Sequence, residues 1–202
     1  MRSIFEPLRT SWDSLTGSVH VYALPGWDAA VVQPWHDAIS RTGVCVVQPV
    51  PFLHATVQRT PLFLPTSRPG ALDRFATALT SIARGRAAFA VPLRRPAVTS
   101  AAVCTTGDPT PEWDALVGEV RAASAAAFLG RPTPAGPHAP HVSLGYARQQ
   151  ADDAPLTAAF AALDAMPWTG TLQVDALHLL SVDANEDAGT FTWSTLSEHP
   201  LR

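Results

Sequence analysis

The chain has 202 residues, of which 47% are hydrophobic and 15% charged, and its net charge at pH 7 is −3. This balance excludes a disordered chain and favours a globular protein, and a mildly acidic chain gives no indication of a long nucleic-acid-binding face. All 14 basic residues are arginine, which excludes a P-loop, a lysine Schiff base and a lysyl-nucleotide intermediate.

The first half of the chain predicts strands around a helix, after an N-terminal extension at residues 1–17. The helix is expected between residues 28 and 42, with its regular part beginning at Pro34. Pro49 and Pro51 favour the edge of a sheet for the segments around them. The expected strands are Ser18–Leu24, Val44–Val50 and Leu53–Gln58.

The second half repeats the order of strand, helix and strand. Further helices are expected at residues 72–84, 111–128 and 152–165. Further strands are expected at Ala88–Leu93, Val98–Thr105, His141–Ala147, Thr171–Ser181 and Thr190–Leu196. The pattern favours an α+β fold over residues 18–202, in which two lobes of antiparallel sheet carry helices on their outer faces and enclose a central cleft.

Each half contains one short strand in which a histidine lies two residues before a hydroxyl residue. Alternate side chains of a strand share a face, so His54 should lie beside Thr56, and His141 beside Ser143. The positions between and beside them should face the core: Leu53, Ala55, Val57, Val142 and Leu144. Two imidazoles and two hydroxyls would then meet at one site.

These motifs resemble those of the two-histidine (2H) phosphoesterase superfamily, in particular its bacterial 2′-5′ RNA ligase branch. That family has two His-x-Thr/Ser-x motifs on strands that line a cleft between pseudo-symmetric lobes. The matching segments here are His54-Ala55-Thr56-Val57 and His141-Val142-Ser143-Leu144. The resemblance covers about residues 18–202. Many members carry threonine at the position of Ser143; serine keeps the hydroxyl but lacks the methyl group that stiffens the rotamer.

The resemblance implies hydrolysis of a 2′,3′-cyclic or related phosphodiester, commonly leaving a 2′-phosphate, and sometimes reversible 2′-5′ RNA ligation. Two histidines near their ordinary pKa of about 6.5 can act as general base and general acid at neutral pH. The hydroxyls of Thr56 and Ser143 would bind the non-bridging phosphate oxygens. The sequence leaves open which histidine is the base, and the scheme requires no metal or cofactor.

The expected partner is an RNA end or a small cyclic nucleotide or oligonucleotide. Three more residues are candidates for substrate contact. Tyr146 could stack on a base or ribose, Arg59 could meet a phosphate, and Phe52 could form the wall of the cleft. Each also has a plainer interpretation, as a core tyrosine, a surface arginine and a core phenylalanine.

Two alternatives to the enzyme stay open. His138, His141 and His54 could hold a metal ion, but no carboxylate or cysteine cluster completes such a site. A non-catalytic module could use the same cleft to bind a phosphate or an RNA end, although such a module has no need of two titrating histidines.

The chain shows no sign of a membrane segment or a secretory leader. No apolar run approaches the ~20 residues that a membrane helix needs, and residues 1–17 lack an apolar centre. Cys45 and Cys104 do not make a disulfide framework, and we expect both thiols to be buried and inert. A monomeric cytoplasmic protein is the expectation.

Overall fold

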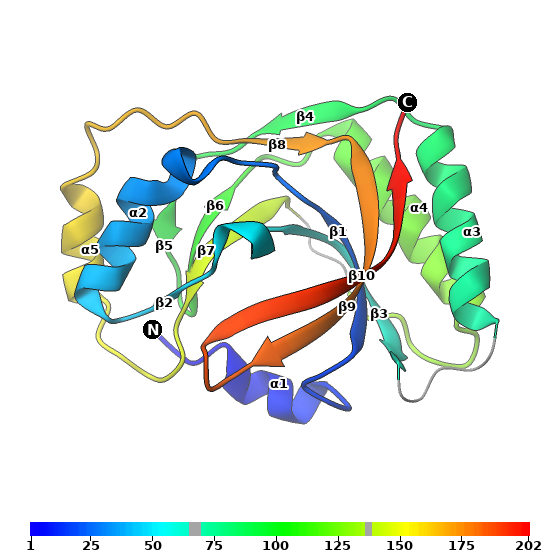
Figure 1. The fold of residues 1–202 in the computed structure, drawn as a ribbon, viewed down its shortest axis with the longest axis horizontal. Coiled ribbons are helices and arrows are strands. Elements are labelled where there is room, and N and C mark those ends of the chain that lie inside the picture. The colour runs from blue at the N-terminus through cyan, green and yellow to red at the C-terminus, as the bar shows by residue number, and fades with distance from the viewer. Residues whose placement is uncertain (65–69, 136–138) are drawn as a thin grey trace.

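The computed structural model describes residues 1–64, 70–135 and 139–202. Every strand pairing in these ranges is antiparallel (Figure 1). The first sheet has the order β10-β9-β1-β3, from Ser18–Ala23 (β1), Ala55–Phe63 (β3), Ala176–Asn185 (β9) and Thr190–Pro200 (β10). The second has the order β2-β7-β6-β5, from Val46–Val47 (β2), Ala97–Val98 (β5), Ala102–Thr106 (β6) and His141–Tyr146 (β7). A third, two-stranded sheet pairs Phe89–Pro92 (β4) with Thr171–Val174 (β8).

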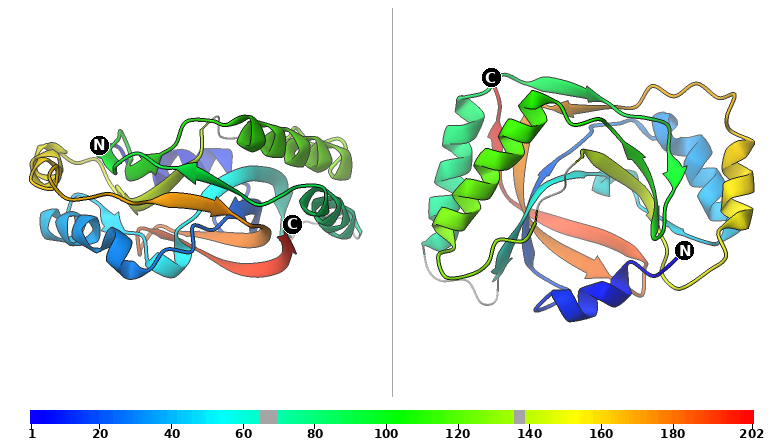
Figure 2. Two further views of the ribbon diagram at one scale, coloured as in Figure 1. Left: turned by 90° about the horizontal axis from the view of Figure 1, so that it is seen from above. Right: turned by 180° about the vertical axis from the view of Figure 1, so that it is seen from behind.

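Two pairs of helices flank the two larger sheets on opposite sides of the molecule, and α1 belongs to neither pair. The helices are Phe5–Ser11 (α1), Ala29–Thr42 (α2), Ala71–Arg84 (α3), Pro111–Ala127 (α4) and Ala154–Ala161 (α5), with a 3-10 turn at Val50–Phe52 (η1). Helices α3 and α4 pack on each other and on the first sheet, and α2 and α5 pack on each other and on the second. Figures 1 and 2 show the two pairs at opposite ends, with the strands between them. The predicted α+β fold with two lobes is confirmed.

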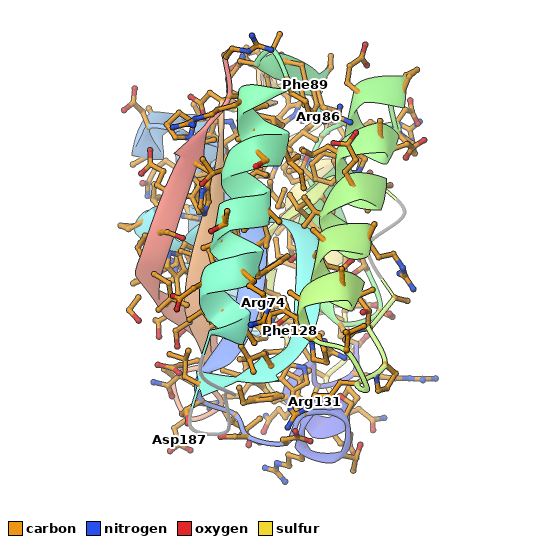
Figure 3. The ribbon with its side chains drawn as sticks, turned by 90° about the vertical axis from the view of Figure 1, so that its right-hand side faces the viewer. Arg74, Arg86, Phe89, Phe128, Arg131 and Asp187 are labelled. Carbon is orange, nitrogen blue, oxygen red and sulfur yellow. The ribbon has the colours of Figure 1, made fainter. Side chains whose placement is uncertain are left out.

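Side-chain contacts fix the position of α3 against α4, the pair that faces the viewer in Figure 3. Helix α4 begins with Pro111, and the Thr110 hydroxyl caps it by accepting a hydrogen bond from the Trp113 backbone N–H at 3.2 Å. Arg86, which follows α3, forms an ion pair of 2.7 Å with Glu119 of α4. Figure 3 shows Arg86 near one end of the pair and Arg131 near the other.

The motif strands alternate as predicted. The side chains at the positions expected to face the core are at most 2% exposed: Leu53, Ala55, Val57, Val142 and Leu144. Strand β3 begins at Ala55, so His54 lies one residue before it rather than inside it. Both β2 and β3 are edge strands, as the prolines around them indicate.

Several predicted boundaries are wrong. The predicted strand Val44–Val50 is reduced to β2 at Val46–Val47, and β3 and β10 extend beyond their predicted ends, to Phe63 and Pro200. Three further differences have a clear physical reason. Helix α2 begins at Ala29 rather than Pro34, because a proline in the second turn removes only one backbone hydrogen bond and its φ suits a helix. The predicted strand Val98–Thr105 is divided between β5 and β6 by a turn. The predicted strand Thr171–Ser181 is divided at Asp175, where the chain passes from the third sheet to the first and the Asp175 carbonyl accepts a hydrogen bond from Leu201.

Residues 1–17 pack against both of the larger sheets. The backbone N–H of Ile4 donates to the carbonyl of Ala147, next to the end of β7, at 3.0 Å. Phe5 is fully buried and stacks on Phe191 of β10 with ring centroids 5.5 Å apart. The division between this segment and a domain at residues 18–202 stays a prediction, but the segment contributes to the pocket described below.

Two other expectations concern the membrane and the thiols. No helix in the described ranges is long and apolar enough to cross a membrane. Cys45 is buried as expected, and burial raises the pKa of its thiol to about 11. The expectation of a buried thiol is wrong for Cys104, which is half-buried and lines the pocket between the sheets.

Candidate active site

A pocket of about 540 Å³ lies where the two larger sheets meet. Strands β1, β3, β6, β7 and β10 and the segment around α1 supply its wall. The side chains that line it include His20, Tyr22, His54, Thr56, Arg59, Cys104, His141, Ser143, Tyr146 and Phe191, together with Ile4, Leu8 and Trp12 from the N-terminal segment. The pocket therefore brings together both motifs and two of the three other predicted contact residues, Arg59 and Tyr146.

A β-bulge in β3 places Arg59 in this pocket. Strand β1 pairs Val21 with Gln58 but Tyr22 with Thr56, so one extra residue, Val57, is inserted in β3. Without the bulge, strict alternation would put Gln58 on the face of Thr56 and turn Arg59 away. The bulge reverses the alternation, and Gln58 is fully buried while Arg59 lines the pocket.

Strand β7 contains a bulge at the equivalent position. Strand β6 pairs Val103 with Gly145 but Cys104 with Ser143, so Leu144 is the extra residue. The bulge brings Tyr146 onto the pocket face, three residues after Ser143. A Cβ added to Gly145 would lie 2.8 Å from the Val46 carbonyl oxygen, so only glycine fits this close approach between β7 and β2.

The two lobes thus present equivalent side chains at equivalent positions. Each motif strand offers the pocket a histidine, a hydroxyl residue two positions later and a larger polar residue three positions after that. The neighbouring strands differ, because the partners of Thr56 and Arg59 on β1 are Tyr22 and His20, while those of Ser143 and Tyr146 on β6 are Cys104 and Ala102.

His54 is held in one orientation and kept neutral. Its Nδ1 lies 3.1 Å from the Phe52 carbonyl, which requires a proton on Nδ1 and leaves the lone pair on Nε2. The imidazole stacks on Tyr22, with centroids 4.0 Å apart and planes 11° apart, and meets the edge of Trp193 at 5.2 Å. Burial, and to a smaller extent the nearby His141, lower the pKa of His54 to about 4.

His141 has the same backbone restraint in a more open setting. Its Nδ1 lies 3.2 Å from the carbonyl of Ala139, again two residues earlier in the chain, so Nε2 is the nitrogen that can transfer a proton. The side chain is half-buried, whereas His54 is 8% exposed. The pocket therefore holds two imidazoles with matched restraints and unequal access to solvent.

The only two tyrosines of the chain both lie in this pocket, one beside each motif hydroxyl. Tyr22 is the register partner of Thr56, and the hydroxyls of Thr56 and Ser143 partly offset the effect of burial on the pKa of Tyr22 and Tyr146, respectively. Burial raises the pKa of Tyr146 to about 12 and the pKa of Tyr22 well above its ordinary value. Both phenols therefore stay protonated and can donate hydrogen bonds across the neutral range.

Arg59 contributes positive charge to the wall. Its guanidinium carbon lies 5.8 Å from the centre of the Trp12 ring, and the side chain is half-buried. Phe52, the third predicted contact residue, does not line the pocket. Its ring packs on Trp193 with centroids 5.0 Å apart, and its backbone carbonyl holds His54 through the hydrogen bond to Nδ1.

Sequence reasoning missed several residues of the pocket. His20 and Tyr22 lie two residues apart on β1, so their side chains share one face of the strand. That face could have been assigned to the pocket if the pairing of β1 with β3 had been known. Trp12 and Phe191 come from opposite ends of the chain, and no local pattern links them to the motifs. The pocket also combines residues of α1 and β10, which only the tertiary fold brings together.

The described residues contain no group of three or more histidine, cysteine, aspartate or glutamate side chains that could hold a metal ion. Of the three histidines in the metal hypothesis, His54 and His141 line the pocket, and His138 lies outside the described residues.

Comparison with known families agrees with this geometry. A family model of the 2′-5′ RNA ligase superfamily matches residues 48–186, a span that contains both motifs. The chain belongs to the 2′-5′ RNA ligase superfamily. The resemblance to 2H phosphoesterases inferred from the two motifs is therefore confirmed. No curated protein sequence matches this superfamily member significantly.

Solved structures of low sequence identity share the superfamily fold. E. coli LigT complexed with 3′-AMP is 15% identical, with a TM-score of 0.63 over 92% of this chain and 98% of LigT. TT0787 of Thermus thermophilus is 17% identical, with a TM-score of 0.66 over 92% and 98% of the two chains. Usb1 of Kluyveromyces marxianus is 13% identical, with a TM-score of 0.51 over 93% and 99%.

Proposed function

We propose that the protein is a metal-independent phosphodiesterase that hydrolyses a 2′,3′-cyclic phosphate, on an RNA end or a nucleotide, or a related 2′-5′ phosphodiester. The observation that carries this proposal is the convergence of His54 and His141 on one pocket. The Nδ1 of each imidazole is hydrogen-bonded to the carbonyl two residues earlier, so the Nε2 of each is free to exchange a proton with a ligand in the pocket.

The unequal environments of the two histidines support unequal roles. Burial keeps His54 neutral at pH 7, and a neutral imidazole with a lone pair on Nε2 is a general base. His54 takes a proton from the attacking water, whose oxygen forms the new bond to phosphorus. The bond from phosphorus to one ribose oxygen breaks, and His141 gives that oxygen a proton from Nε2. The product is a phosphomonoester. If a ribose 5′-hydroxyl took the place of water, the same steps would form its bond to phosphorus, break the bond to the 3′ oxygen and leave a 2′-5′ phosphodiester.

The remaining pocket residues suit the charged part of the substrate. The hydroxyls of Thr56 and Ser143 would donate to the two non-bridging oxygens, and Arg59 would balance their negative charge. These groups lie on fixed strands, so they need little reorganisation during the reaction.

The apolar side of the pocket suits a nucleoside. Leu8, Trp12 and Phe191 line it, and a volume of about 540 Å³ is within the range of small-molecule sites. Any of the four bases can stack on such aromatic rings, because each base has a π-face. A second groove of about 450 Å³ shares Arg59 with the pocket and is also lined by Arg131 and Asp13. In an RNA substrate, the nucleotide next to the reacting phosphate would lie in this groove.

The test is hydrolysis of the four nucleoside 2′,3′-cyclic monophosphates in the presence of EDTA, with the 2′- and 3′-phosphate products resolved. We expect turnover by the wild-type protein and none by His54→Ala. Loss of activity in EDTA would contradict the metal-independent mechanism. Phosphate binding without turnover of any cyclic nucleotide, RNA 2′,3′-cyclic end or 2′-5′ dinucleotide would favour the alternative, a non-catalytic binding module.

A pH profile tests the assignment of His54 as the base. A base must be unprotonated, so kcat/KM falls when the pH drops below its pKa in the free enzyme. With the pKa of His54 at about 4, the acid limb should lie well below pH 6, and activity at pH 5.5 should remain close to that at pH 7. An acid limb at pH 6.5 or higher would contradict the assignment.

Stability must be followed in the same pH range. In the unfolded chain His54 titrates near the ordinary value of about 6.5, and in the folded chain it titrates at about 4. Between these values the unfolded state binds more protons, so the free energy of unfolding decreases as the pH falls. The profile is therefore measured only where circular dichroism shows the folded protein.

A further inference from the structure

The pocket continues into two grooves, and an arginine lines both sides of each junction. Arg59 lines the pocket and the second groove, as described above. Arg131 lines the second groove and a third groove of about 320 Å³, which lies between the start of α3 and the end of α4. Figure 3 shows Arg74, which also lines the third groove, at the same end of the helix pair as Arg131. A path therefore leads from the candidate active site to this end of α3 and α4.

Two segments of the chain run along this path and form its walls. Edge strand β3 lines the pocket with Thr56 and the third groove with Leu62. The segment after α4 runs the opposite way, lining the third groove with Leu129 and the pocket with Ala135. The Arg131 side chain connects the two walls by donating to a backbone carbonyl of β3 at 3.0 Å. From Thr56 to Leu62 the strand rises about 20 Å, at ~3.3 Å per residue, so the path extends well beyond the pocket.

The charge along this path is opposite to that of the whole chain. The chain has 17 acidic and 14 basic residues, whereas the pocket and the two grooves are lined by three arginines, Arg59, Arg74 and Arg131, and by one acidic residue, Asp13. None of these arginines forms an ion pair with a described residue, although three arginines elsewhere in the chain pair with carboxylates. Cations without acidic partners along a groove attract an anionic ligand.

The third groove also presents apolar surface to a ligand. Leu129 is 77% exposed, more than any other large hydrophobic side chain in the described ranges, and it lines this groove together with Leu62 and Phe128. Positive charge next to exposed apolar surface suits a nucleotide, because its phosphate is charged and its base has an apolar face. A simple inorganic anion would use only the arginines.

We propose that Arg131 and Arg74 bind the backbone phosphates of an RNA strand whose 3′ end occupies the candidate active site. This inference rests on the proposed function. The reacting phosphate lies in the pocket, the next phosphate along the strand lies between Arg59 and Arg131, and the one after it lies between Arg131 and Arg74. A mononucleotide fills only the pocket, so Arg131 and Arg74 make the enzyme selective for an oligonucleotide of at least three nucleotides.

The dependence of kcat/KM on substrate length tests this selectivity. For RNA ends that carry a 2′,3′-cyclic phosphate, we expect kcat/KM to rise from the mononucleotide to the trinucleotide and to change little for the tetranucleotide. Arg131→Gln should lower kcat/KM for the trinucleotide about tenfold, and Arg74→Gln about threefold because Arg74 is exposed. Neither variant should alter kcat/KM for the mononucleotide. Equal kcat/KM at all lengths would overturn the proposal.

Two further comparisons separate phosphate binding from other effects. Arg131 also holds β3, so Arg131→Gln could disturb that strand; Arg74 makes no side-chain hydrogen bond with a described residue, and its variant is then decisive. The matched control is Arg84→Gln, since Arg84 is exposed and lies on the same helix, about 15 Å from Arg74 at 1.5 Å per residue. It should leave kcat/KM unchanged at every length. Equal losses in Arg74→Gln and Arg84→Gln would mean that only net charge matters, and would overturn the proposal.

Binding tests the path without turnover. The affinity of the trinucleotide 2′,3′-cyclic phosphate is measured by calorimetry at several salt concentrations, in the His54→Ala background. Each phosphate contact of a single strand contributes about 0.7 to the steepness of log Kd against the logarithm of the salt concentration, so Arg74→Gln should reduce the steepness by about 0.7 and Arg84→Gln should not. An unchanged steepness in Arg74→Gln would overturn the proposal. If the wild-type protein turns over no phosphodiester, the proposed function fails by itself, and these affinities still decide whether a strand follows the path.

Discussion

Replacement of either His54 or His141 by alanine is expected to reduce kcat by at least about 10³-fold, and the double replacement should be scarcely more severe. One imidazole must accept a proton while the other donates one in the same displacement, so the second has little left to do once the first is lost. The measurement is single-turnover hydrolysis of nucleoside 2′,3′-cyclic monophosphates by the two single variants and the double variant. Additive losses in the double variant would mean that the histidines act in separate steps.

A matched control for these variants is His199→Gln. His199 is as buried as His54, but it lies on the helix-covered side of the first sheet, where its Nδ1 contacts the Thr80 hydroxyl at 2.9 Å. Its loss should alter stability and leave kcat at the wild-type value. A large fall in kcat for His199→Gln would indicate that loss of any buried histidine disturbs the fold, and the result for His54 would lose its meaning.

Gly145→Ala is expected to lower the free energy of unfolding by about 1–3 kcal/mol, the usual cost of forcing extra atoms into a packed interior. The added Cβ would lie 2.8 Å from the Val46 carbonyl and 3.3 Å from the Ile39 side chain. Because the obstacle at Val46 is backbone, either β2 or β7 must shift. A shift of β7 would also displace Tyr146, so kcat/KM should fall with stability. Urea unfolding and steady-state kinetics on the same preparation measure both.

Gly118→Ala supplies the opposite control. Gly118 lies within α4, and a Cβ added there meets nothing within 4 Å. The substitution should raise the free energy of unfolding by about 0.5–1 kcal/mol, because alanine loses less backbone entropy in a helix than glycine does. Equal effects of the two substitutions would show that the approach of β2 to Gly145 is not what restricts this position.

Much of the site follows from strand alternation alone. The spacing of His54 and Thr56, and of His141 and Ser143, places each pair on one face, and the apolar residues between them are buried as the pattern requires. Such local periodicity survives folding because one face of each strand meets the core.

The sequence identifies Arg59 and Tyr146 as candidate substrate contacts but does not show that their side chains face the pocket. A strict period of two puts Arg59 on the opposite face from Thr56, and Tyr146 on the opposite face from Ser143. The bulges at Val57 and Leu144 reverse both assignments, and they become visible only in the register of each strand against its neighbour. The hydrogen-bond partner of a strand is set by tertiary contacts, which a single sequence does not contain.

The N-terminal side of the pocket could not be predicted for a similar reason. Nothing in the pattern of residues 1–17 links Trp12 to the motifs, because the contacts that bring it there are with His20, Arg59 and Phe191. The predicted wall residue Phe52 shows the reverse case. It is close to His54 in sequence, yet its ring turns to Trp193 and only its backbone carbonyl contacts the imidazole.

The paired bulges mean that distance along the chain and position in the pocket can vary independently among related proteins. Removal of Val57 would leave Gln58 opposite Val21 and Arg59 opposite His20, so a regular strand one residue shorter would present the same side chains to a ligand. The same holds for the extra residue of β7. Relatives that lack either bulge would therefore carry the residue equivalent to Arg59 or Tyr146 one position closer to the motif. An alignment without a gap at this point would pair pocket residues with core residues.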